Sequence, residues 1–218
     1  MHIQRLFIYP IKSLLPVEVS SAEITSTGFR HDRQYILVKD PATRSEKKQS
    51  ILDDDQDTSP SAPVLAEHLT IKTLSKLCLF QSSIDLGSLT LTVRHNISGE
   101  GLTVPLEPAA EFLSGPNRFE VEIFGTRALG LDLGNDAATF FSKHLSQPAR
   151  LLYIGQNSNG LLGREIPAPS LVPRKQRAIS WLHGEEIHDQ KIQFADAAPL
   201  LLTTTASEHD ARSTFAWI

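Results

Sequence analysis

The sequence predicts a mainly β fold of the α+β class, with an antiparallel, barrel-like module at its N-terminal end and few helices. Three observations support this prediction. Short segments alternate between apolar and polar residues, as half-buried strands do. Glycine and proline separate these segments at the short intervals that are typical of a barrel or a sandwich. One stretch stands out as a helix, residues 135–145, because its apolar residues follow a helical spacing.

The first predicted strands form a meander with short loops. Residues 3–9 are apolar and aromatic enough for a strand, and Pro10 ends it because proline has no amide proton to donate. Residues 17–25 form the next predicted strand, and Gly28 supplies the turn after it. A third strand over residues 34–39 returns the chain. The loop after the first strand and the loop before the third would then meet at one edge.

Three polar side chains, Lys12, Ser13 and Arg33, lie in these two loops. Two cations and a hydroxyl group suit a phosphate, because phosphate oxygens accept charge-assisted hydrogen bonds. We therefore expect these residues to face one ligand. A solvated basic loop is the alternative, since clusters of this kind are common by chance.

Two motifs surround these loops, namely Leu6-Phe7-Ile8-Tyr9-Pro10-Ile11-Lys12-Ser13, and Thr27-Gly28-Phe29-Arg30 followed by Asp32-Arg33. Together they resemble the N-terminal β-barrel module of MOSC proteins. That group contains the amidoxime-reducing component and the C-terminal part of molybdenum cofactor sulfurases. The resemblance implies a molybdenum–molybdopterin cofactor, whose terminal phosphate and polar pterin edge Lys12, Ser13 and Arg33 would contact.

Residues 40–63 interrupt the pattern of strands. The segment is polar, charged and proline-bearing, so it cannot bury enough apolar surface to offset the entropy lost on ordering. We expect a mobile insertion between strands. The aspartates within residues 53–57 could bind a divalent cation, but such runs of charge are more often solvated.

Strand-like sequence resumes over residues 69–80, 88–94 and 118–124. The second segment alternates, with Leu89, Leu91 and Val93 expected on the buried face. The third alternates in the same way, with Phe119, Val121 and Ile123 inward. Cys78 is the one cysteine of the sequence, which excludes an internal disulfide. It lies among leucines and a phenylalanine and is expected to be a small buried residue.

The predicted helix begins near Asn135 or Asp136, either of which can cap it, and Pro148 follows its end. Residues 149–154 form the next predicted strand. The stretch around Ser146-Gln147-Pro148-Ala149-Arg150-Leu151 again resembles the amidoxime-reducing component. We divide the chain into a barrel module over residues 1–126, a helix-containing connector over 127–170, and the start of a MOSC domain, truncated, over 171–218.

The last segment contains Asp196-Ala197-Ala198-Pro199 and then a turn rich in serine and threonine. This resembles a strand and turn of the MOSC family, and in relatives that turn contacts the cofactor. Thr204 and Ser207 are therefore further candidates for cofactor binding. The alternative is that Thr205 or Ser207 caps a helix. Strands are expected over residues 191–194 and 200–204. The polar stretch 183–188, with two histidines five residues apart, is read as a turn.

The composition limits the classes of partner. A net charge of −4 gives no reason to expect nucleic acid. No apolar run approaches the roughly 20 residues of a membrane span, and strand-like sequence begins almost at Met1, where a signal peptide would lie. A single cysteine suits a reducing compartment. These features predict a cytoplasmic protein.

The resemblance implies an oxidoreductase that reduces N-hydroxylated compounds and receives electrons from cytochrome b5 and its reductase. In the family, the chain continues to a cysteine that ligates molybdenum, and no residue after Ser207 matches that segment. We therefore assign no catalytic residue and no metal ligand, and expect this chain to be inactive alone. A module for sulfur transfer or cofactor handling is the second hypothesis; its relatives bind pyridoxal phosphate in a desulfurase domain that this sequence lacks. A catalytically inert fragment is the third.

Overall fold

Strands predominate in the computed structural model, as the sequence predicts. The structure describes residues 2–25, 27–41, 64–109, 118–123, 126–154, 161–162, 191–192, 202–207 and 209–210. The strands are β1 (Leu6–Ile8), β2 (Val17–Val19), β3 (Ile24–Thr25), β4 (Gly28–Phe29), β5 (Tyr35–Lys39), β6 (Val64–Ala66), β7 (Phe80–Asp85), β8 (Thr90–His95), β9 (Gly101–Pro105), β10 (Arg118–Ile123), β11 (Thr126–Asp132), β12 (Ala149–Tyr153), β13 (Leu161–Leu162) and β14 (Lys191–Ile192). A 3₁₀-helix, η1 (Ser75–Leu79), and an α-helix, α2 (Asn135–Leu145), accompany them.

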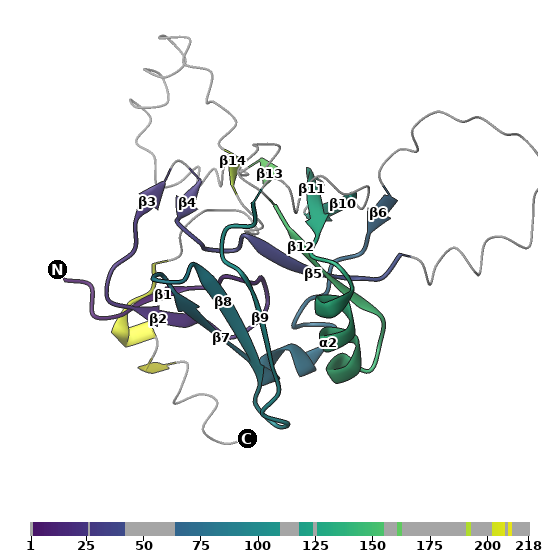
Figure 1. The fold of residues 1–218 in the computed structure, drawn as a ribbon. Coiled ribbons are helices and arrows are strands. Elements are labelled where there is room, and N and C mark those ends of the chain that lie inside the picture. Colours follow the sequence, from purple (N-terminus) through teal and green to yellow (C-terminus); the bar gives the residue numbers. More distant parts are fainter. Residues whose placement is uncertain are drawn as a thin grey trace, which may run out of the picture.

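A five-stranded sheet in the order β5-β12-β11-β10-β6 forms the barrel of the molecule (Figure 1). Its neighbours are antiparallel except β10 and β6, which run parallel. The chain then returns from β6 to β5: the amide of Lys39 donates to the carbonyl of Glu67, and the amide of Leu69 donates to that of Leu37, both at 2.8 Å. Residues 67–69 directly follow β6 and are thus hydrogen-bonded to β5. This contact brings the two ends of the sheet together.

Strands β5 and β12 separate two hydrophobic cores. Along β5, Ile36 and Val38 belong to the core of the barrel, whereas Tyr35 and Leu37 belong to a second core on the other side of the strand. Side chains of β12 alternate between the cores in the same way. A strand that is buried on both faces has no polar face. This explains the uninterrupted apolar run Tyr35–Val38, all of which is buried.

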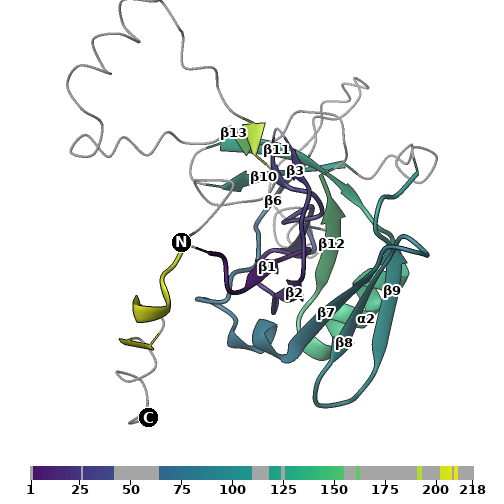
Figure 2. The ribbon, with the colours of Figure 1, turned by 90° about the vertical axis from the view of Figure 1, so that its left-hand side faces the viewer.

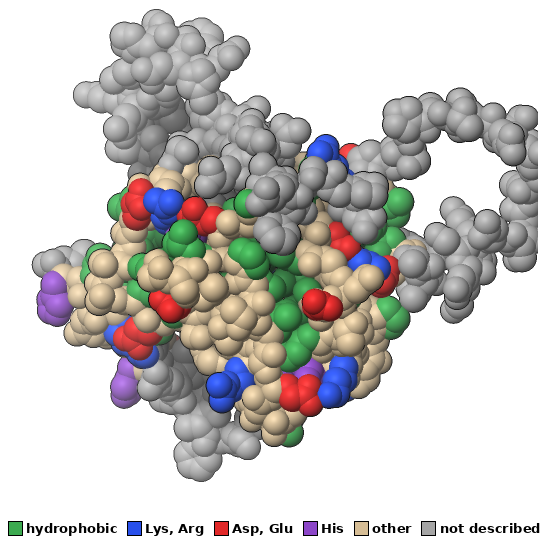
Figure 3. Space-filling model, viewed as in Figure 1, with side chains coloured by type: hydrophobic (Ala, Val, Ile, Leu, Met, Phe, Trp, Pro, Cys, Tyr) green, Lys and Arg blue, Asp and Glu red, His purple; other side chains and the backbone are tan. Residues whose placement is uncertain are grey.

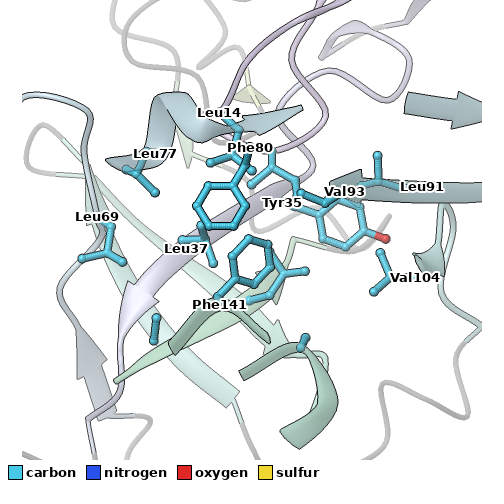
Figure 4. Packing of buried hydrophobic residues seen from close by; sticks show 14 of the residues in the cluster. Leu14, Tyr35, Leu37, Leu69, Leu77, Phe80, Leu91, Val93, Val104 and Phe141 are labelled. Carbon is cyan, nitrogen blue, oxygen red and sulfur yellow. The ribbon is translucent and has the colours of Figure 1, made fainter. Parts of the chain in front are cut away.

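The three-stranded sheet β7-β8-β9 and helix α2 cover the second core (Figure 2). Phe80 of β7 and Phe141 of α2 lie with ring centroids 5.4 Å apart, close to Leu37 (Figure 4). His95 of β8 stacks on His144 of α2 at 4.2 Å. The helix presents an apolar side to this core because its buried residues, Ala137, Phe141 and Leu145, are spaced by four.

The predicted strand over residues 69–80 is wrong in its central part. Thr70 to Thr73 form a turn, and η1 follows. A 3₁₀-helix repeats every three residues, so Leu74, Leu77 and Phe80 point to the same side and pack into the core. Cys78 lies one residue past that side and is exposed, contrary to the prediction that it is buried.

Four smaller details also differ from the predictions. The single strand expected over residues 17–25 is two strands, β2 and β3, with different partners. Gly28 does not form the turn itself but begins β4, at φ +124°. Gly134, rather than Asn135 or Asp136, occupies the N-cap of α2. Leu89 has φ +51°, is half exposed and lies just before β8, so Leu91, Val93 and His95 form the buried face there.

Several predictions concern residues outside the described ones. Most of the insertion at 40–63, with its aspartates, is among these, as are the histidines at 183 and 188 and most of residues 171–218. Within the described part, β13 and β14 pair antiparallel. The division of the chain into three parts stays a prediction. None of the helices in the described ranges is long and apolar enough to cross a membrane.

Candidate anion-binding site

Two turns lie against each other at the start of β5. One follows β1 and carries Lys12 and Ser13, and the other precedes β5 and carries Arg33. The amide of Arg33 donates to the carbonyl of Tyr9 at 2.6 Å, and the amide of Lys12 donates to that of Tyr35 at 2.9 Å. The structure therefore brings together the backbone positions of the three residues that the sequence places in one site.

Backbone strain is concentrated at these turns. Ser13, His31 and Arg33 have φ angles of +70°, +63° and +52°, a left-handed conformation that L-residues other than glycine seldom adopt. Such conformations cost free energy and persist where the surroundings impose them, often at binding sites. Three of the five non-glycine residues with positive φ in the described part of the chain therefore lie in these two turns.

Asp32 joins the two turns. It is buried, with 6% of its surface exposed, and its Oδ1 accepts a hydrogen bond from the amide of Tyr9 at 2.7 Å. Its Oδ2 accepts one from Nη1 of Arg33 at 2.5 Å. Burial raises the pKa of Asp32 above its ordinary value, and the positive charge of Arg33 and the amide of Tyr9 offset this only in part.

The charges of the site suit an anion. Lys12 is buried, with 6% of its surface exposed, whereas the Arg33 side chain is 23% exposed and also lies over the ring of Tyr9, with its guanidinium carbon 5.4 Å from the centroid. Ser13 is half-buried beside them. When ionised, Lys12, Arg33 and Asp32 together carry one net positive charge. A phosphate or carboxylate is the kind of group that such a set binds.

A second polar cluster holds the segment before β5. Glu107 accepts hydrogen bonds from Nε and Nη2 of Arg30, at 3.2 and 2.9 Å. Nε2 of His31 lies 3.8 Å from the same carboxylate. Burial, together with the charge of Glu107, raises the pKa of Tyr153 to about 12. These contacts tie the segment to the chain that follows β9.

Thr204 and Ser207, the other predicted binding residues, are both exposed. Oγ1 of Thr204 accepts the amide of Ser207 at 3.1 Å and lies 2.9 Å from its hydroxyl. This is the geometry of a helix N-cap, with Thr204 as the capping residue instead of Thr205 or Ser207. The hydrogen bonds of the described residues do not link this pair to Arg33, and its role toward a cofactor stays a prediction.

Sequence reasoning missed Asp32 and Glu107. An acid directly between His31 and Arg33 was a usable signal, because a carboxylate beside a ligand-binding arginine needs a structural reason. Glu107 had no such signal, since its partner Arg30 lies 77 residues earlier.

Among the described residues, no three His, Cys, Asp or Glu side chains converge to hold a metal ion. On the face drawn in Figure 3, basic and acidic side chains lie side by side.

A β-barrel with two turns joined at the start of β5 defines a class of β-barrel module, and the comparisons identify that class. The chain belongs to the family described as the MOSC N-terminal beta barrel domain, whose model matches residues 1–148.

Three relatives show the breadth of the family. Molybdenum cofactor sulfurase of Danio rerio is 28% identical over 148 residues, covering 67% of this chain and 15% of the relative. Mitochondrial amidoxime-reducing component 1 of Mus musculus is 24% identical over 216 residues, with 97% and 50% covered. Mitochondrial amidoxime reducing component 2 of Homo sapiens is 28% identical over 212 residues, with 94% and 49% covered. The chain thus spans about half the length of these amidoxime-reducing components.

Proposed function

We propose that this chain binds a molybdenum cofactor as part of an oxidoreductase that reduces N-hydroxylated compounds such as amidoximes. The observation that supports the proposal is the pair of turns held together by Asp32 and by backbone hydrogen bonds, which brings the backbones of Lys12, Ser13 and Arg33 together. Membership of the MOSC family and the names of the relatives support this choice of cofactor.

The chain's own residues bind and orient in this proposal. Arg33 and Lys12 would hold the terminal phosphate of the molybdopterin by charge-assisted hydrogen bonds. The Ser13 hydroxyl would donate a hydrogen bond to the polar edge of the pterin. Thr204 and Ser207 would add hydroxyl contacts. A bound molybdenum cofactor would supply the redox chemistry, which no side chain of the site can perform.

The extent of the sequence matches favours a function in amidoxime reduction over one in sulfur transfer. The amidoxime-reducing components match 94–97% of this chain, whereas the zebrafish sulfurase matches 67% of it. Reduction of an amidoxime by an oxidoreductase that contains this chain would separate the two functions, because a sulfur-transfer module would not catalyse it. Cytochrome b5 and its reductase are the proposed electron donors, and the cytoplasm stays the predicted compartment.

Cofactor affinity tests the proposal. We expect the chain to retain the cofactor in equilibrium dialysis, with the bound pterin quantified by fluorescence after oxidation. One lost charge-assisted hydrogen bond is worth on the order of 1.5–3 kcal/mol, so Arg33→Ala and Lys12→Ala should each weaken binding by about tenfold or more.

Arg127→Ala is the matched control, because Arg127 is an arginine with two carboxylate partners on the barrel surface. Its substitution should leave affinity unchanged. Equal losses in all three variants would indicate a nonspecific basic surface instead of a site. No retention of cofactor by the unmodified chain would overturn the proposed function.

A further inference from the structure

The carboxylate of Asp32 would not itself contact an anion, yet it touches both turns of the site. Its Oδ1 holds the amide of Tyr9 at 2.7 Å, and its Oδ2 holds Nη1 of Arg33 at 2.5 Å. Neighbouring side chains usually point apart, but the left-handed backbone of Arg33 folds its guanidinium back onto the preceding residue. A buried negative charge beside a proposed anion site needs an explanation, because it weakens the attraction for the ligand.

The guanidinium of Arg33 offers that explanation. It carries five N–H donors in a planar fork, so opposite edges can serve different acceptors. Among the described residues, Asp32 is the hydrogen-bond acceptor for this side chain, and it uses Nη1. Nε and Nη2 remain for a ligand, and the side chain is still 23% exposed.

We infer that Asp32 is a positioning residue, which takes one edge of the Arg33 guanidinium and thereby aims the other edge at the anionic group of the ligand. The same carboxylate fixes the turn of Lys12 and Ser13 through the Tyr9 amide, so one buried group sets both halves of the site. The inference rests on the proposed function for the identity of the ligand. It also requires an arginine at position 33, because the three donors of a lysine ammonium lack the planar fork that can hold a carboxylate on one edge and the ligand on another.

Three variants of the chain, Arg33→Lys, Arg33→Ala and Asp32→Asn, test this with the cofactor in equilibrium dialysis. Arg33→Lys should lose about tenfold or more in affinity, close to Arg33→Ala, although it keeps the charge. Asp32→Asn should also lose affinity, because asparagine replaces one of the two acceptor oxygens by an NH2 group, which cannot accept from either the Tyr9 amide or Nη1 of Arg33. Combined with Arg33→Ala, Asp32→Asn should cause little further loss, since the two residues act as one unit.

Wild-type affinity in Arg33→Lys would overturn the inference, because charge alone would then suffice. Fully additive losses in the Asp32→Asn, Arg33→Ala double variant would also overturn it. Arg33→Lys leaves the buried carboxylate paired, so it keeps the test open if Asp32→Asn fails to fold.

A measurement without cofactor separates this inference from the proposed function. In the unliganded chain, NMR should show slow rotation of the Arg33 guanidinium about its Cζ–Nη1 bond, and fast rotation in Asp32→Asn. Equal rotation in both proteins would overturn the pairing, whatever the cofactor does. Slow rotation without any cofactor retention by the wild-type chain would instead reject the proposed function and, with it, the ligand that Asp32 was inferred to serve.

Discussion

Arg150 and Arg127 each have two carboxylate partners, and they show how burial decides the contribution of an ion pair to stability. Arg150 donates to Asp132 at 2.6 Å and to Asp40 at 2.9 Å, and the Asp132 side chain is only 1% exposed. Arg127 donates to Glu120 and Glu122 at 3.3 Å, but it is 58% exposed. Removing Arg150 leaves a buried charge without its partner, whereas removing Arg127 leaves two carboxylates in water.

We therefore expect Arg150→Ala to lower the free energy of unfolding by about 3–5 kcal/mol. Arg127→Ala should lower it by no more than about 1 kcal/mol. Urea unfolding followed by circular dichroism measures both. Equal small losses would contradict the view that Arg150 neutralises a buried carboxylate.

Gly130 is a residue whose missing side chain matters. A Cβ at this position would lie 3.0 Å from Cβ and Cδ1 of Leu152 on the neighbouring strand. Gly130→Ala should destabilise the fold by about 1–3 kcal/mol, because the core of the barrel has no room for a methyl group without a shift of Leu152. Gly101→Ala is the control, since the nearest atom there is 3.6 Å away. An unchanged melting temperature in Gly130→Ala would contradict this, because it would show that Leu152 can shift at little cost in free energy.

At the scale of elements, the contact between α2 and the β8–β9 hairpin should respond to pH. His95 stacks on His144, and Glu100 of the hairpin binds both Lys143 and His144 of the helix. Burial and the nearby His144 lower the pKa of His95 below its ordinary 6.5, while Glu100 acts in the opposite direction. The folded state thus favours neutral His95, and as pH falls below about 6.5 the unfolded state binds the proton first.

Stability should therefore be fully present above about pH 6.5 and decline as the pH falls below it. His95→Phe keeps a ring for the stack and removes the titration, so its unfolding free energy should fall less between pH 7 and pH 5.5. Chemical denaturation at these two values measures the difference. Parallel declines in both proteins would assign the pH dependence to other groups.

The predicted elements were correct where one physical rule decides the outcome. The alternation from Phe119 to Ile123 and the helical spacing of Ala137, Phe141 and Leu145 follow from burial on one face, and the structure agrees. The prediction of a strand over residues 69–80 was wrong because an apolar run does not distinguish a strand from a 3₁₀-helix. The error about Cys78 followed from this wrong assignment. The loops of Lys12 and Arg33 were placed together correctly, but the role of Asp32 depends on left-handed backbone angles that no pattern of residue types reveals.

At the scale of the whole molecule, β5 and β12 lie between both cores and connect them. Their backbone amides should be the slowest to exchange with solvent, because opening either strand exposes apolar side chains on two faces. The β3–β4 hairpin, which forms a separate two-stranded sheet, should exchange much faster. Hydrogen exchange followed by mass spectrometry tests this order, and equal protection of the two regions would contradict it.

The return of residues 67–69 to β5 has a consequence for how the chain tolerates change in length. The described residues on either side of positions 42–63 lie side by side, because the amide of Lys39 donates to the carbonyl of Glu67 and Nζ of Lys39 donates to its carboxylate. For a flexible connection, each doubling of the number of residues costs only about 0.6 kcal/mol of closure entropy. We therefore expect the barrel to stay folded when the connection between Asp40 and Val64 is lengthened or shortened, or when a reporter domain is inserted there.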